Sequence, residues 1–297
     1  HLGNVRMTLT EQSQTDTYPP ATMEDVNAAD EEKYYSNLPF TRDQPPGGYP
    51  WGTQKAAKVN GSGNKIGPAI ILKVMEGDKF NITANSWWTG LPDNNAPPSV
   101  LNNLANALSG NIVNVGGGHI NHTELTSSGL LLGSATDFLA TQNGFITSRP
   151  KAFINWILLD EQFKYVATSS GFQQVDGVNI AGQHTYSNLP VQKSGYLYIY
   201  VSNETPNIDV WFDNLQVTHI RGPILDETHY YPFGLTMSGI SSKALNFRNP
   251  TNRIKYNGME LQSNEFSDGV GLELYEYKYR FYDHQIGRFI SQDKLAD

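Results

Sequence analysis

Four tryptophans offer flat aromatic surfaces on which a sugar ring can stack: Trp87, Trp88, Trp156 and Trp211. Sugar recognition combines such surfaces with short polar side chains, and Asn, Ser and Thr are frequent in this chain. A further stripe of rings alternates along one segment, at Tyr196, Tyr198 and Tyr200. These residues indicate a carbohydrate-binding surface. Packing within a sheet or against a neighbouring domain is the alternative for the stripe.

Several other chemistries lack the residues they need. The chain has no cysteine, which excludes disulfides, a thiolate nucleophile and Cys-ligated metal clusters. No Gly-x-Ser-x-Gly turn presents a serine nucleophile. The run Gly116-Gly117-Gly118 lacks the Lys-Ser/Thr pair of a phosphate-binding loop.

The charge balance limits the partners of the protein. With 21 Lys and Arg against 29 Asp and Glu, the net charge is −8, so binding to nucleic acid is not expected. Charged residues make up 17% of the chain, against about 25% in an average soluble domain. No apolar run approaches the roughly 18 residues of a membrane span. The composition favours an extracellular, strand-rich protein, and the start at His1 without a signal peptide suggests a fragment of a longer one.

The stretch from about residue 31 to 220 has the pattern of one all-β unit. Apolar or alternating segments predict strands at 70–74, 80–84, 152–159, 163–168, 195–201 and 209–217. Turn residues separate these segments, which favours a sandwich. Leucines at helical spacing predict one helix from Leu101 to Gly110, and a second helical turn is expected near 135–141.

The segment 209–217 changes phase in its middle. Strict alternation would put Val210 and Phe212 on one face of the strand and Leu215 and Val217 on the other. All four lie on the same face if Asp213-Asn214 contributes one extra residue, which predicts a β-bulge.

The two ends of the chain differ from its middle. Residues 5–9 alternate as a short strand after a Gly-Asn turn, and 10–30 are polar and acidic, which suggests a solvated connector. From about residue 221 onward, short aromatic strands alternate with Gly turns, as in a β-repeat array.

Specific motifs occupy these ends, at residues 1–6, 227–235, 252–260, 271–275 and 280–293. With these motifs, roughly residues 1–10 and 221–297 resemble the RHS-repeat-associated core domain, in the form common in Bacteroidota. The middle resembles sandwich inserts that interrupt this family. The resemblance implies a hollow shell of wound Tyr-Asp-type repeats, closed at one end by the core domain and followed by a C-terminal effector, often a toxin.

In several members of that family the core cleaves itself as an intramolecular aspartyl protease. The aligned motif positions here are Asp283, Gly287, Arg288 and Asp293. The chemistry requires two carboxylates that share a proton, which Asp283 and Asp293 would supply. His284 and Lys294 stand where the family usually has proline, and a cation beside Asp293 favours ionisation of both carboxylates. The alternative is a set of turn residues with a structural arginine.

The segment 209–217 also resembles the final strand of carbohydrate-binding β-sandwiches, in which carboxylates near the first and last strands often hold a structural Ca²⁺. Oxygen ligands suit this cation. Asp213 and Asn214 together with Glu31 or Glu32 are the candidates here, and a solvated aspartate at a bulge is the alternative.

We therefore expect an all-β chain, with a jelly-roll-like β-sandwich inserted into RHS/YD-repeat shell segments. Its expected parts are an opening strand with an acidic linker at 1–30, the sandwich at 31–220 and the core segment at 221–297. The expected role is non-catalytic: a secreted or cell-surface scaffold whose partners are the remaining shell and a C-terminal effector. A carbohydrate-binding or adhesive module and an autoprotease are the competing hypotheses.

Overall fold

The computed structural model of the protein describes residues 3–12, 14–94, 99–115, 129–237, 241–244, 252–263, 266 and 271–293. The chain divides into two compact units, one formed by Ser13–Gly222 and the other by His1–Gln12 with Pro223–Asp297. The middle of the sequence is thus one unit, and the two ends of the sequence come together in the other.

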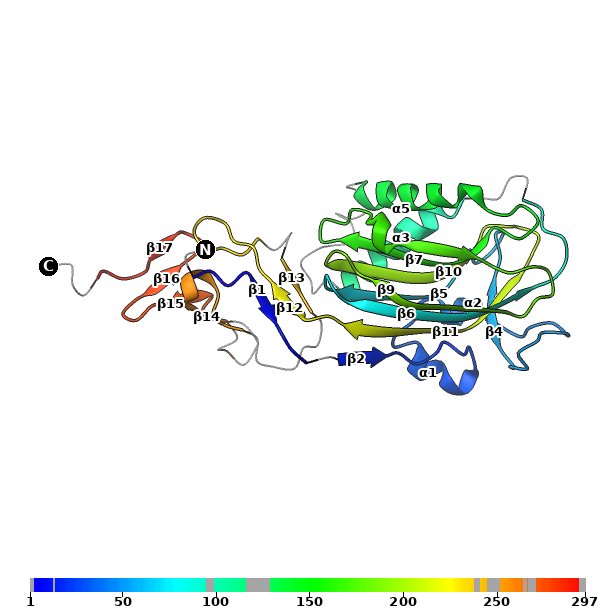
Figure 1. The fold of residues 1–297 in the computed structure, drawn as a ribbon, viewed down its shortest axis with the longest axis horizontal. Coiled ribbons are helices and arrows are strands. Elements are labelled where there is room, and N and C mark those ends of the chain that lie inside the picture. Colours follow the sequence, from blue (N-terminus) through cyan, green and yellow to red (C-terminus); the bar gives the residue numbers. More distant parts are fainter. Residues whose placement is uncertain are drawn as a thin grey trace. The chain divides into compact units, whose positions relative to one another are not determined.

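Two antiparallel sheets build the larger unit (Figure 1). The four-stranded sheet contains, in spatial order, β5 (Ile66–Val74), β10 (Gly195–Asn203), β7 (Ala152–Asp160) and β8 (Gly171–Gln174). The six-stranded sheet contains β3 (Arg42–Asp43), β4 (Ala56–Val59), β11 (Val210–Arg221), β6 (Lys79–Trp88) and β9 (Gly182–Pro190), and β2 (Gln14–Thr17) also pairs with β11. Two short helices, α1 (Ala28–Glu31) and α2 (Leu38–Thr41), precede β3.

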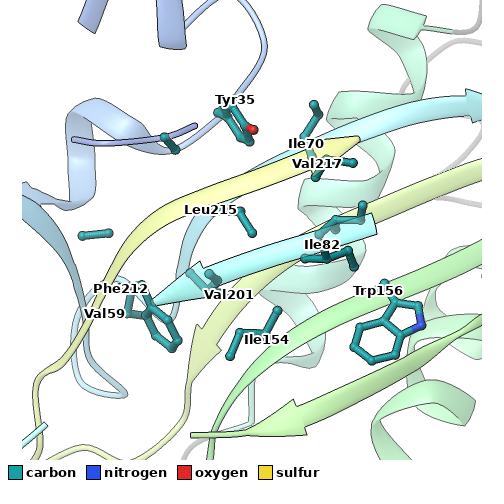
Figure 2. Close-up of a cluster of buried hydrophobic side chains, with 14 of the residues drawn as sticks. Tyr35, Val59, Ile70, Ile82, Ile154, Trp156, Val201, Phe212, Leu215 and Val217 are labelled. Carbon is teal, nitrogen blue, oxygen red and sulfur yellow. The ribbon is translucent and has the colours of Figure 1, made fainter. Parts of the chain in front are cut away.

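The main core fills the space between these two sheets (Figure 2). Ile154 and Val201 contribute from the four-stranded sheet, and Ile82 contributes from the six-stranded sheet. Phe212 and Leu215 both point into this core, because the β11–β6 register shifts between Asp213 and Gln216. The predicted bulge is confirmed, and it keeps the apolar side chains on one face of the strand.

The tyrosine stripe of β10 points away from the main core. Tyr198 and Tyr200 belong to a second core with side chains from α3 (Leu101–Val115) and α5 (Leu130–Ala140), which cover the outer face of the four-stranded sheet (Figure 1). The stripe is therefore sheet-to-helix packing. The helix predicted to stop at Gly110 continues to Val115, because glycine inside a helix costs only about 1 kcal/mol relative to alanine.

Two expectations from the sequence are wrong. Residues 163–168 do not form a strand: Phe163 has a positive φ of 60°, and Tyr165 makes only an isolated bridge to Leu159. Residues 14–23 are not a solvated linker, because β2 pairs with β11, and Ala21 and Met23 are buried in the main core. The boundary of the sandwich therefore lies near Ser13 instead of residue 31.

The Tyr200 hydroxyl is buried and has no hydrogen-bond partner among the described residues. An unsatisfied buried hydroxyl opposes folding, so Tyr200→Phe is expected to leave the free energy of unfolding unchanged or to raise it by about 1 kcal/mol. Tyr35→Phe is the matched control, because the Tyr35 hydroxyl donates to the Pro19 carbonyl at 2.8 Å and should cost about 1 kcal/mol when removed. Urea denaturation measures both changes. Equal losses for the two variants would contradict the expectation.

His184 is a buried titratable group of the sandwich. Its Nε2 lies 2.8 Å from the Ser86 hydroxyl, and burial lowers its pKa, although the Asp176 carboxylate acts in the opposite direction. The unfolded chain then binds this proton more readily than the folded one, so stability is lost as the pH falls through the ordinary histidine range.

Between about pH 7.5 and pH 5.5, the melting temperature of the wild type should therefore fall further than that of a His184→Gln variant. Thermal scans of both proteins measure the difference. Parallel curves would show that His184 does not contribute.

The smaller unit consists of two further antiparallel sheets. The first contains β1 (Met7–Leu9), β12 (Ile224–Glu227) and β13 (Ser242–Lys243). The second contains β14 (Glu260–Gln262), β15 (Leu274–Glu276), β16 (Phe281–Asp283) and β17 (Arg288–Phe289). Both units are built from antiparallel sheets, so the predicted all-β class is confirmed.

The opening strand is tied to the tail at several points. In the β1–β12 pair, Met7 lies opposite Glu227. The Val5 amide donates to the Lys255 carbonyl at 2.9 Å, and the Tyr230 hydroxyl donates to the Val5 carbonyl at 2.8 Å. Tyr275 is buried at the centre of an aromatic group in the tail.

Candidate functional site

A charged triplet lies across one end of the six-stranded sheet. Lys58 on β4 places its Nζ 3.6 Å from an Asp43 carboxylate oxygen and 3.4 Å from an Asp209 carboxylate oxygen. Asp43 belongs to β3, and Asp209 immediately precedes β11. The Asn60 amide donates to Asp209 at 2.7 Å and so fixes that carboxylate. Three separate segments of the chain thus meet in a strongly polar cluster, in which one cation lies between two carboxylates.

Two adjoining pockets share this triplet. One has a volume of about 500 Å³ and the other about 410 Å³, which lies within the range of small-molecule sites. The first is further lined by Phe40, Arg42, Asn60 and Asn64. The second is further lined by Gln44, Pro46, Asn207 and Trp211. Charged groups, amides and aromatic rings therefore face the same groove.

Next to the groove lies a pair of tryptophans on the outer face of the sheet. Trp211 on β11 is directly opposite Trp87 on β6, and together with Ala56 they form a small apolar cluster separate from both main cores. The Tyr49 ring packs edge-on against Trp87, with ring centroids 5.9 Å apart. Tyr49 belongs to the connection between β3 and β4, here called the 44–55 loop.

One buried carboxyl group connects this loop to the sheet. The Asp213 side chain accepts a hydrogen bond from the Thr53 hydroxyl at 3.1 Å and a longer one from the Tyr49 hydroxyl at 3.4 Å. Burial raises the pKa of Asp213 to about 7, although these hydroxyls and the Asn214 amide favour the ionised form. The charge state of Asp213 therefore changes near neutral pH.

All four predicted sugar-stacking tryptophans are buried in the structure. Trp88 and Trp156 are buried in the main core, where the Trp88 indole donates to the Asp176 carbonyl at 2.7 Å. Trp87 and Trp211 are each only 5% exposed. None of the four presents an open ring face, because Trp88 and Trp156 point into the main core and the 44–55 loop packs on the cluster of Trp87 and Trp211.

The predicted calcium ligands have other partners. Glu31 is buried and accepts hydrogen bonds from the Thr22 amide at 2.8 Å and from the Thr22 hydroxyl. Glu32 pairs with Arg42 at 3.0 Å, and Asn214 occupies the bulge with a positive φ of 53°. Across the described residues there is no group of three or more His, Asp or Glu side chains that could hold a metal ion. The calcium site therefore stays a prediction without support from this geometry.

The core-motif carboxylates also have distinct structural roles. Asp283 accepts backbone hydrogen bonds from Gln285 at 2.8 Å and Ile286 at 3.3 Å, within the turn that joins β16 to β17. Gly287 completes this turn with a φ of +68°. Asp293 pairs with Arg280, with a nitrogen–oxygen distance of 2.9 Å. These contacts are those of turn and ion-pair residues.

The neighbouring motif positions fit the same description. Arg288 is exposed on β17, and it is Arg280 that stacks on the Phe289 ring, at 3.9 Å from the ring centroid. His284 is buried edge-on against Tyr275, and burial lowers its pKa. Lys294 lies outside the described residues.

The groove residues Asp43, Lys58 and Asp209 do not stand out in the sequence. The only local signal is Lys58, a charge within the otherwise apolar segment Ala56–Val59. Asp43 and Asp209 come from distant segments, so their meeting depends on the sheet order.

Comparison with known proteins gives no family assignment. No family model matches the chain, and no curated protein is similar to it in sequence. One solved structure, "Family 16 Carbohydrate Binding Module-2", has a TM-score of 0.31 and 11% identity, and the match covers 62% of this chain and 89% of that one. A second, "Crystal Structure of Tripeptidyl Peptidase 2 (TPP II)", has a TM-score of 0.24 and 11% identity, over 64% of this chain and 10% of that one. Similarities this low establish no shared function.

Among the helices that the structure describes, none is long and apolar enough to cross a membrane.

Proposed function

We propose that the chain is a non-catalytic structural part of a secreted or surface RHS-like protein. In this proposal the smaller unit belongs to a β-shell that encloses and delivers a C-terminal effector, and the sandwich is a module inserted into that shell. The observation that carries the proposal is the pairing of β1 with β12, because it joins the two motif-bearing ends of the sequence in one sheet.

The surface of the smaller unit supports the same proposal. Large apolar side chains are exposed there, including Leu9 at 59%, Phe233 at 62% and Ile286 at 64%. The sheet β14–β15–β16–β17 also ends in β17, which among the described residues pairs with β16 alone. Exposed apolar patches and open strand edges are typical of surfaces that other segments cover. Further strands of a shell would cover both features.

The test uses the parent protein with its natural upstream and downstream sequences. If the shell encloses the effector, the downstream segment should resist added protease in the native protein. Gly234→Val should abolish this resistance, because Gly234 has a φ of +89° and its added side chain would meet the Tyr256 ring. Gly63→Val is the control, since nothing lies within 4 Å of the position a side chain would take there. The proposal would be overturned if the downstream segment were digested as fast in the native protein as in Gly234→Val.

The proposal assigns no catalysis to Asp283 and Asp293. The same parent protein should stay intact on storage, with Asp283→Asn giving the same band pattern on a gel. A cut just beyond Asp293 that disappears in Asp283→Asn would replace the structural role with intramolecular aspartyl proteolysis.

We also propose glycan binding by the sandwich as a second function, on the basis of the groove around Lys58. A nearly neutral set of carboxylates, cations and amides beside aromatic rings suits a polyhydroxylated ligand better than a strongly charged one. An array of defined neutral and acidic oligosaccharides tests this. Binding should fall at least about tenfold in Lys58→Ala and Asp209→Ala, as expected for loss of a hydrogen-bonded polar contact. Lys33→Ala is the control, since Lys33 is exposed and pairs with Asp30.

A further inference from the structure

The Trp87–Trp211 pair is unusual for its position on the sheet. Both rings lie on the face of β6 and β11 that points away from the main core, and their cluster contains no other tryptophan. Two large rings on an outer face would normally be covered by a packed layer, such as the helices over the tyrosine stripe. Here the cover is the 44–55 loop, through the Tyr49 ring.

The loop is fixed at its ends and lightly held in its middle. At one end, Asp43 on β3 pairs with Ala56 on β4. At the other, the Gln54 and Lys55 amides donate to the Glu24 carboxylate at 2.7 Å and 3.2 Å. These contacts keep both ends in place if the middle of the loop moves.

The middle is joined to the sheet through Asp213 and the Trp87 ring. Its Gly48 and Gly52 have φ values of +91° and +68°, and no atom lies within 4 Å of where a side chain would stand at either position. Glycines with open surroundings permit other backbone conformations. The loop can thus lift away without breaking the sheet.

The space beside the loop is already partly open. The 410 Å³ pocket is walled by Gln44 and Pro46 of the loop and by Trp211 of the sheet. Lys58, the central cation of the groove, lies 5.9 Å above the Trp211 ring. Lifting the loop would therefore extend the polar groove onto the two indole faces.

We propose that the 44–55 loop is a removable cover over a sugar-binding platform formed by Trp87 and Trp211, and that ionisation of Asp213 favours its opening. The proposal rests on glycan binding by the sandwich, as proposed above, and adds the platform and its control. A sugar ring would replace the Tyr49 ring on the indoles, while Asp43, Lys58 and Asp209 hydrogen-bond its hydroxyls. Stacking on an indole suits the apolar face of a sugar ring.

The direction of the pH effect follows from the burial of Asp213. In the closed state burial disfavours the ionised form of Asp213, and the Glu24 carboxylate disfavours it further, although the Thr53 and Tyr49 hydroxyls favour it. In the open state water would solvate the carboxylate. The closed state therefore binds the proton more tightly, and raising the pH shifts the loop toward the open state.

The test combines acrylamide quenching of tryptophan fluorescence with the oligosaccharide array, at about pH 5.5 and pH 8. All variants carry Trp51→Phe, which removes the indole of the loop itself. Quenching and binding are both expected to rise with pH, binding by about tenfold or more. The pair Tyr49→Phe and Thr53→Val removes the two hydroxyls with little change of shape, and it should bind and be quenched strongly at both pH values. Asp213→Asn should remove the pH dependence.

Trp87→Phe and Trp211→Phe should weaken binding at both pH values, with circular dichroism as the check on folding. If binding depends on Lys58 but is unchanged by the tryptophan and hydroxyl variants, the proposed loop cover is wrong. Glycan binding by the groove would still be supported. No binding by either the wild type or the hydroxyl-free variant would overturn both.

Discussion

Replacing Asp78 with alanine is expected to lower the free energy of unfolding of the sandwich by about 3–5 kcal/mol, because it leaves several hydrogen-bonding groups without their partner, at about 1–3 kcal/mol for each buried one. The Asp78 carboxylate is buried and lies 2.7 Å from the His219 Nε2. It also accepts the Met75 amide at 2.8 Å and the Gly222 amide at 2.6 Å. The substitution would leave three polar groups without this partner: the buried His219 ring, the buried Met75 amide and the half-buried Gly222 amide.

Urea denaturation followed by tryptophan fluorescence measures this loss. Glu76→Ala is the matched control, because Glu76 is exposed in the same turn and should change stability by no more than about 0.5 kcal/mol. Asp78→Asn keeps the shape but removes the charge, so its loss should be intermediate. If Asp78→Ala lowers the free energy of unfolding by less than about 1 kcal/mol, water replaces the hydrogen bonds of the carboxylate and the expectation is wrong.

Deleting residues 1–9 is expected to unfold the smaller unit while the sandwich stays folded. The deletion removes β1, the partner of β12, together with the backbone bond from Val5 to Lys255 and the acceptor of the Tyr230 hydroxyl. A small unit that buries few side chains has a small free energy of unfolding, so the loss of these contacts is enough to unfold it. Amide exchange in β12 and β15 should therefore accelerate by at least about a hundredfold, corresponding to roughly 2.7 kcal/mol.

Hydrogen exchange resolved by mass spectrometry measures the two units separately. Exchange in β7 and β10 should not change, which would show that the sandwich is independent of the opening strand. The double variant Met7→Thr and Leu9→Thr is the control, because both side chains are exposed while the pairing is through the backbone. Unchanged protection of β12 after the deletion would contradict the central role given to this strand.

The strands with a strong pattern could be predicted from the sequence. In β10, Leu197 and Ile199 alternate with Tyr198 and Tyr200, and the two sets enter different cores. The bulge at Asp213-Asn214 was also predictable, because only one extra residue keeps the apolar side chains of β11 on one face.

Segments held by backbone pairing could not be predicted in the same way. Residues of β2 are polar, and their place beside β11 depends on amide and carbonyl groups that no side-chain pattern reports. Segment 163–168 has apolar residues, but a positive φ at Phe163 interrupts the extended backbone.

The candidate site was predictable only in its chemistry. Tryptophans and short polar groups led to the hypothesis of a sugar-binding surface on the sandwich, which stays a proposal. Whether each ring is open or covered depends on tertiary neighbours: Trp156 lies in the main core, and Tyr49 comes from a loop about forty residues away from Trp87 in the sequence. The meeting of Lys58 with Asp209 depends on sheet order in the same way.

The strands by which the chain enters and leaves the sandwich lie side by side. Gln14 is opposite Arg221 in the β2–β11 pair, and in the smaller unit the Thr10 amide donates to the Pro223 carbonyl at 2.8 Å. Each unit therefore presents its two connection points as neighbours. Because the connection points are adjacent, the sandwich is a replaceable module. Recombination can delete it, with a short turn joining residue 12 to residue 223 in a continuous chain. Recombination can also replace it with another domain whose termini lie close together.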